Sequence, residues 1–130
     1  MKVVDANVLL YAVDRQSPQH RVAKGWIDQA LSGSEAIVLP WLSLLAFVRI
    51  STHPSIYDRP LTVDQACDVV DQWLRAPAAT SVEPREGHVE RLRSALGQTG
   101  RGGNLVNDAH LAALAQENRA TVVTFDSDFG

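Results

Sequence analysis

Short apolar runs alternate along the chain with longer segments in which apolar residues recur every three or four positions. The short runs predict strands over residues 2–4, 36–39, 80–82 and 121–124. The longer segments have helical periodicity and predict helices over residues 7–13, 18–31, 40–50, 61–76, 87–96 and 105–117. Strands separated by helices form βαβ units, which require a parallel sheet covered by helices on both faces. The pattern therefore predicts an α/β fold.

Polar and proline residues mark where several of these helices begin and end. Pro40 suits the first turn of one helix, and His53-Pro54 ends it because a residue before proline avoids the helical region. Thr62 and Gln65 match a capping box at the start of the next helix. The three tryptophans and the one cysteine occupy helical positions where we expect packing in the core: Trp26, Trp41, Trp73 and Cys67.

The chain has the size and composition of one ordinary globular domain. It is 130 residues long and 45% hydrophobic, which excludes disordered, collagen-like and coiled-coil classes, and we expect a single domain over residues 1–130. Its 12 basic and 15 acidic side chains give a net charge of −3. That balance argues against a broad basic surface for nucleic acid.

Features of secreted and membrane-spanning proteins are absent from the sequence. One cysteine permits no internal disulfide, and no spacing of cysteine and histidine matches a zinc site. Asp5 places a carboxylate where a signal peptide would be apolar, and no stretch approaches the ~18 apolar residues of a membrane span. We therefore expect a cytoplasmic protein with no membrane contact.

Acidic residues follow the first and the last predicted strands. Asp5 comes directly after residues 2–4, and Asp126 and Asp128 come just after residues 121–124. In open parallel sheets, ligands bind outside the carboxyl ends of the strands. The other interpretation is structural: Asp5 would cap a helix, and Asp126 and Asp128 would be turn residues.

Asp108 lies on the apolar face of the helix predicted over residues 105–117. Its neighbours three and four positions away are Leu105, Leu111 and Ala112. A carboxylate buried there needs a partner or a metal ion, although it would also complement the positive end of its own helix. We interpret Asp108 as a functional residue.

Several carboxylates that converge without lysine or cysteine partners suit a hard divalent cation. Mg²⁺ and Mn²⁺ prefer oxygen ligands and keep waters that a phosphate group can displace. Such an ion would relieve the mutual repulsion of the acids. The reaction that this kind of site serves best is phosphodiester hydrolysis.

Three segments carry these acids in order: residues 3–12 (VVDANVLLYA), 104–115 (NLVNDAHLAALA) and 122–129 (VVTFDSDF). Together they resemble the motifs of the PIN-domain ribonucleases, and within them the VapC-type toxins of bacterial toxin–antitoxin pairs. The resemblance covers nearly the whole chain. It implies a three-layer α/β/α fold around a central parallel sheet.

The resemblance also implies an activity, a cofactor and partners. The activity is Mg²⁺- or Mn²⁺-dependent endoribonuclease cleavage that leaves a 5′-phosphate and a 3′-hydroxyl, with Asp5, Asp108 and Asp126 as catalytic metal ligands and Asp128 as a further ligand. The substrate would be RNA such as a tRNA or rRNA loop, because sequence-specific RNA recognition favours unpaired loops. The family further implies a homodimer and a VapB-type antitoxin that blocks the acidic groove.

Two departures from the family pattern affect these expectations. The family usually has a glutamate on the helix after the second strand, and at that place this chain has Ala46, which offers no ligand atom. The site would then hold one metal ion rather than two, or use Asp128 or Asn104 instead, or be inactive. The sequence also stops at Gly130, where the family continues into a short edge strand, so a sheet of four strands is expected.

Other polar residues have both a functional and a structural interpretation. Asn7 and Asn104 are candidates for donors that hold the acids in place. Arg49, three residues after Ala46, could contact the scissile phosphate or lie over apolar surface, and Ser43 could bind substrate or water or be an ordinary helix residue. The arginines between residues 85 and 101 are interrupted by glutamates and predict a solvated helix face. His110 is assigned no catalytic role because it points away from Asp108.

Two other functional classes compete with the nuclease. A phosphoacceptor signalling domain also has acids at strand ends, but it needs a lysine after a late strand, and the only lysines are Lys2 and Lys24. A binding-only module that keeps its antitoxin interface would explain Ala46. Apart from the four candidate metal ligands, the chain has 12 basic and 11 acidic residues, so its net negative charge belongs to the predicted cation site. This charge distribution favours the nuclease.

Overall fold

A parallel sheet of four strands lies at the centre of the structure, which is a computed structural model that describes residues 1–97 and 105–126. The strands are β1 (Lys2–Val4), β2 (Ile37–Val38), β3 (Ala79–Thr80) and β4 (Thr121–Val123), in the order β3-β2-β1-β4. Val3 of β1 is in register with Val38 and Val122 on either side. β1 is therefore an interior strand, and both of its backbone edges are paired.

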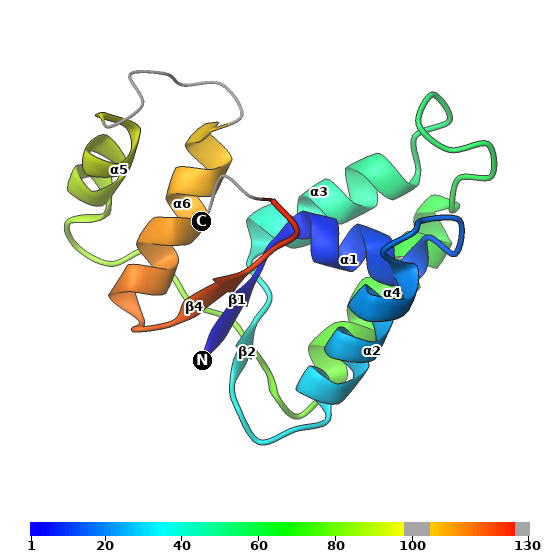
Figure 1. The fold of residues 1–130 in the computed structure, drawn as a ribbon, viewed down its shortest axis with the longest axis horizontal. Coiled ribbons are helices and arrows are strands. Elements are labelled where there is room, and N and C mark those ends of the chain that lie inside the picture. Colours follow the sequence, from blue (N-terminus) through cyan, green and yellow to red (C-terminus); the bar gives the residue numbers. More distant parts are fainter. Residues whose placement is uncertain (98–104, 127–130) are drawn as a thin grey trace.

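Helices connect the strands and cover the sheet. They are α1 (Ala6–Val13), α2 (His20–Leu31), α3 (Trp41–Ser51), α4 (Val63–Arg75), α5 (His88–Gly97) and α6 (Leu105–Glu117). Figure 1 shows α1 to α4 on one side of the sheet and the pair α5 and α6 on the other. This arrangement confirms the predicted three-layer α/β/α fold. No helix in the described part of the chain is both long enough and apolar enough to span a membrane.

β1, β2 and β4 each contribute to two separate cores, because successive side chains point to opposite faces of a sheet. Val4 and Ile37 pack into the larger core with α1 to α4. Val3 and Val38 pack into the smaller core with Leu111 of α6. Burial on both faces explains why these strands are continuous apolar runs rather than alternating ones.

The structure confirms most predicted elements and corrects two predicted core residues. β1 and α6 have the predicted bounds, and Thr62 and Gln65 form the predicted capping box. Trp41, however, is 53% exposed, because it is the first residue of α3 and lies outside the buried face. Cys67 is also exposed, because the buried stripe of α4 runs along the adjacent face through Ala66, Val70 and Trp73.

A buried carboxylate of α6 binds α5 through several hydrogen bonds. α5 has no buried residue, and the side chain of Glu117 at the end of α6 is 0% exposed. Its carboxylate accepts hydrogen bonds from His88 Nδ1 at 2.6 Å and Arg91 Nη1 at 3.0 Å. It also accepts one from the backbone N–H of Arg85 at 3.1 Å. This part of the predicted solvated face is therefore a buried ion-pair cluster.

The same cluster includes His110, whose Nδ1 lies 2.9 Å from His88 Nε2. Burial by itself would raise the pKa of Glu117, but the hydrogen bonds from His88 and Arg85 and the charges of His88 and Arg91 hold that pKa below its usual 4.5. Burial and the neighbouring His88 lower the pKa of His110 below 6.5, against the opposing effect of Glu117. Both groups bind protons less readily in the folded chain.

We expect the free energy of unfolding to fall in acid, in two ranges. In each case the unfolded chain binds a proton at a higher pH than the folded chain does. The free energy of unfolding therefore falls as the pH drops below 6.5, where the unfolded chain protonates His110, and falls again below 4.5, where it protonates Glu117. At pH 7, Glu117→Gln should cost about 2 kcal/mol because it removes the counter-charge of Arg91 and a carboxylate acceptor of the His88 hydrogen bond. Urea denaturation across this pH range measures both effects.

Glu90→Gln is the matched control, since the Glu90–Arg93 pair on the same helix is 71% and 70% exposed. It should change the free energy of unfolding by less than about 0.5 kcal/mol. Equal effects of the two substitutions would mean that Glu117 does not hold α5 in place.

Candidate acidic site at the sheet edge

Two neighbouring strands place polar side chains at one edge of the sheet. β1 and β4 are paired in parallel, with Val4 opposite Val123, so Asp5 and Thr124 are the next residues on each strand. The ladder continues through the N–H of Asp5, which donates to the carbonyl of Val123 at 3.0 Å. Asp5 and Asp126 therefore follow adjacent strand ends.

Asp5 combines the two roles that its sequence position permits. It is the N-cap of α1, and its Oδ1 accepts the N–H of Ala6 at 2.7 Å. Its Oδ2 accepts a hydrogen bond from Thr124 Oγ1, also at 2.7 Å. Each carboxylate oxygen keeps a further lone pair, so the cap does not prevent a ligand role.

Thr124 is the centre of the hydrogen-bond network and was not singled out by the sequence pattern. Its hydroxyl donates to Asp5 and accepts the Nδ2 hydrogen of Asn7 at 3.1 Å and the N–H of Asp126 at 2.9 Å. Asn7 Oδ1 in turn accepts the N–H of Phe125 at 3.1 Å. The residues that follow β4 are thus bound to the first turn of α1. A threonine directly before the Phe-Asp pair was the only sequence signal for this role.

Asp108 lies in the first turn of α6 and is half-buried. α6 packs against β1 and β4 and leads directly into β4, so its first turn lies toward the end of the sheet where the strands finish (Figure 1). Asp126 is also half-buried. Asp128 and Asn104, the other two predicted members of the site, lie outside the described residues, as does Arg101.

The candidate residues of α3 occupy three different environments. Ser43 is 1% exposed, and its hydroxyl donates to the carbonyl of Val4 at 2.7 Å, so it connects α3 to the end of β1. Ala46, one turn later, is half-buried, and Arg49 in the last turn is exposed. The hydroxyl of Ser43 is used inside the protein, one residue before Asp5.

The donor atoms at this edge suit a hard divalent cation in their chemistry. They are carboxylate oxygens from Asp5, Asp108 and Asp126, with hydroxyl and amide groups beside them. Within residues 1–97 and 105–126, however, no group of three His, Cys, Asp or Glu side chains is arranged to hold a metal ion. The set predicted from the sequence includes Asp128, which lies beyond that part of the chain.

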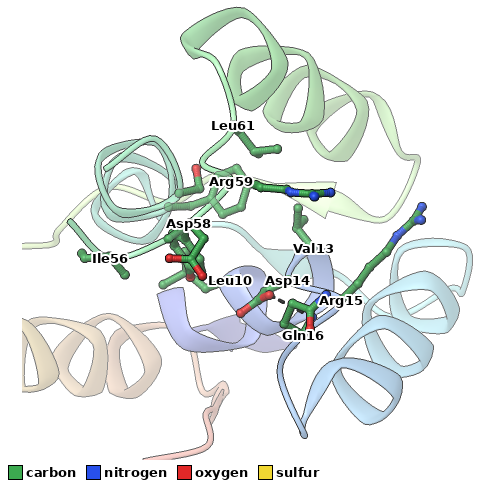
Figure 2. Close-up of a pocket in the computed structure, with 12 residues that line it drawn as sticks. Leu10, Val13, Asp14, Arg15, Gln16, Ile56, Asp58, Arg59 and Leu61 are labelled. Atoms are coloured by element: carbon green, nitrogen blue, oxygen red, sulfur yellow. Dashed lines mark hydrogen bonds between the residues drawn. The ribbon is translucent and has the colours of Figure 1, made fainter. Parts of the chain in front are cut away.

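A second feature is a cavity of about 860 Å³ between the ends of α1 and α3 and the segment before α4. Leu10, Val13 and Phe47 form its apolar wall. Figure 2 shows Arg15 and Arg59 extended on one side of it, and Asp14 and Asp58 add negative charge among the lining residues. The cavity is lined by none of the acids at the sheet edge.

The comparisons with known proteins agree with this fold. The model of the PIN domain family matches residues 2–130, so the chain belongs to the PIN domain family. Ribonuclease VapC37 of Mycobacterium tuberculosis is 51% identical over 130 residues, which cover 100% of this chain and 90% of that protein. VapC ribonuclease Mb2897 of Mycobacterium bovis is 35% identical over 129 residues, covering 99% and 88%. Within the family, the chain is therefore of the VapC type.

Two solved structures share the fold at low sequence identity. The crystal structure of VapBC2 from Rickettsia felis bound to a DNA fragment from their promoter matches with a TM-score of 0.63 and 20% identity, over 98% of this chain and 89% of that one. The crystal structure of FitAcB from Neisseria gonorrhoeae matches with a TM-score of 0.60 and 18% identity, over 99% and 90%.

The two buried serines of α3 provide a test of how the site is supported. Ser43→Ala should lower the free energy of unfolding by about 2 kcal/mol, because it removes a buried hydrogen bond to the strand that carries Asp5. Ser51→Ala is the matched control: Ser51 is 6% exposed, and its hydroxyl has no hydrogen-bond partner among the described residues. That change should cost less than about 0.5 kcal/mol or stabilise the protein. Urea denaturation of both variants decides the point, and equal costs would contradict a supporting role for Ser43.

Proposed function

We propose that this protein is a Mg²⁺- or Mn²⁺-dependent endoribonuclease toxin of a toxin–antitoxin pair. The observation that supports the proposal most directly is the joining of the two strand ends by Thr124, which fixes the Asp5 carboxylate beside the start of the segment that carries Asp126. The similarity to relatives named as VapC ribonucleases supports the same reaction class.

In this proposal, Asp5, Asp108, Asp126 and Asp128 hold the metal ion. When bound, the ion supplies positive charge that stabilises the phosphate as its bond is broken and that lowers the pKa of a bound water. Without a cation, these carboxylates would repel the RNA backbone. Because Ala46 supplies no carboxylate, we propose that the site holds a single metal ion rather than a pair.

The residues of the chain orient the acids before substrate arrives. The hydrogen bonds to both oxygens of Asp5 leave its carboxylate one well-defined orientation. Such fixed polar groups need no rearrangement during the reaction, which is how enzymes gain most from electrostatic stabilisation. Asn7 fixes the segment after β4 relative to α1 and so maintains the spacing of the two strand ends.

We further propose a VapB-type antitoxin partner, a homodimer, an RNA substrate with an unpaired loop and a cytoplasmic location. The structural similarity to VapBC2 of Rickettsia felis supports the antitoxin. The cavity in Figure 2 suits a peptide segment: its wall is apolar, and its two aspartates and two arginines match a partner of mixed charge better than a phosphate backbone.

The homodimer rests on the family resemblance, and the exposed Trp41 and Leu45 of α3 offer apolar surface for it.

The alternative is a catalytically weakened module that keeps antitoxin or RNA binding. The observation that favours it is Ala46, a half-buried methyl group at the place where the family carries a carboxylate. The two proposals differ only in the rate of cleavage and in metal affinity, so both quantities must be measured.

The nuclease proposal predicts that the purified protein cleaves structured RNA in Mn²⁺ or Mg²⁺ and that EDTA abolishes the cleavage. Asp5→Asn and Asp108→Asn should each lower the rate by at least about 100-fold, because charge stabilisation is usually the largest part of such catalysis. Asp28→Asn, at an exposed aspartate of α2, is the matched control and should leave the rate unchanged. Full activity in the double Asp5→Asn, Asp108→Asn variant would rule the proposal out.

Restoring the carboxylate on α3 separates the active enzyme from the weakened module. Ala46→Glu should tighten Mn²⁺ binding about tenfold, since a further oxygen ligand of opposite charge joins the site. Isothermal titration with Mn²⁺ measures the effect, and Leu45→Glu, the next residue on the exposed face, is the control for added charge alone. Gln29→Glu, at an exposed position of α2 outside the proposed dimer surface, is a further control for added charge. Unchanged affinity in Ala46→Glu would contradict the alignment of Ala46 with the family's glutamate.

A further inference from the structure

Phe125 is a large apolar side chain at the edge of the sheet where the candidate acids lie. It is 41% exposed, although it sits between Thr124 and Asp126. Its backbone N–H is bound to Asn7 Oδ1 at 3.1 Å, in the same network that holds Asp5. The position of Phe125 is therefore tied to that of the acids.

Tyr11 of α1 supports the ring of Phe125 from one side. The two ring centroids lie 5.2 Å apart, and the planes meet at 77°, so the pair is edge-to-face. Such a contact fixes the orientation of a ring. Because an edge-to-face partner covers a ring only in part, an exposed portion of Phe125 remains beside the acidic site. Figure 1 shows the end of β4 passing beside α1, the helix that carries Tyr11.

We propose that Phe125 is a stacking platform for one unpaired nucleobase next to the phosphate that is cleaved. This inference rests on the proposed nuclease function and adds a residue that selects single-stranded RNA. A flat apolar ring beside carboxylates matches a nucleotide, which carries a flat base and a phosphate on one unit. An apolar peptide would need to cover those carboxylates without neutralising them, which costs free energy.

The platform has a physical consequence for the choice of substrate. A base that is paired within a helix has both faces covered by its neighbours, so only an unpaired base can stack on Phe125. Stacking on an aromatic side chain strengthens binding and depends little on the identity of the base. Phe125 would therefore select unpaired RNA without reading its sequence.

The experiment measures binding and cleavage separately. Binding of a fluorescein-labelled single-stranded RNA is followed by anisotropy in Ca²⁺, a larger cation that carboxylate oxygens also bind, and gel analysis of the same samples checks that the RNA stays intact. Phe125→Leu keeps the apolar volume without the aromatic face and should weaken binding about tenfold, whereas Phe125→Trp should bind within about twofold of the original protein. Equal unfolding midpoints show that both variants fold, as expected for an exposed side chain.

A second series removes one base at a time from the RNA, leaving the backbone intact. The original protein should lose affinity at one position next to the cleaved bond, and Phe125→Leu should show no further loss there. Equal binding by Phe125→Leu and the original protein, or equal losses at every position, would overturn the platform.

The same samples distinguish failure of the platform from failure of the nuclease. If the original protein cleaves RNA in Mn²⁺ and Phe125→Leu binds and cleaves equally well, only the platform is wrong. If Phe125→Leu weakens RNA binding but the original protein never cleaves, the platform stands and the nuclease is wrong. If the original protein binds no RNA, both proposals are overturned.

Discussion

The rest of the structure depends on a hydrogen-bonded carboxylate at the end of the interior strand β1. Val3 and Val4 are fully buried, and the next residue, Asp5, emerges where β1 ends. Its two oxygens receive one hydrogen bond from the start of α1 and one from Thr124 beyond β4. A charged group at that depth is stable because each oxygen has a donor. The same bonds that stabilise Asp5 also fix α1 and β4 against the central strand.

Much of the fold is predictable because strands buried on both faces leave a simple signal. The apolar runs identify β1 and β4, and the capping box at Thr62 marks the start of α4. The acids at strand ends could also be predicted, because parallel strands deliver their last residues to one edge. The sequence does not predict contacts between residues far apart in the chain. Thr124 reaches Asp5 across 119 positions, and Glu117 reaches His88 across 29, and neither contact has a local pattern.

The errors about exposure have a common cause. Periodicity identifies a helix, but it does not say how wide the buried stripe is. On α4 the stripe is narrow, so Cys67 is exposed although its neighbour Ala66 is fully buried. On α5 no residue is fully buried, and its polar side chains His88 and Arg91 bind the buried carboxylate of Glu117. The sequence of a mixed-charge segment such as residues 85–93 therefore predicts solvated surface, even where the segment binds a buried carboxylate.

Ala46 shows that the fold and the charge of the site are separable. The hydrogen bonds that hold Asp5 come from Ala6 and Thr124, and Ser43 connects α3 to β1 through a backbone carbonyl. None of these contacts needs a carboxylate at position 46. An alanine there favours the helix, and it avoids the repulsion that a further acid would add in the absence of a cation. The hydrogen bonds of this part of the scaffold are therefore independent of the side chain at position 46, and in the proposed nuclease an effect of Ala46 would fall on metal affinity and cleavage rather than on folding.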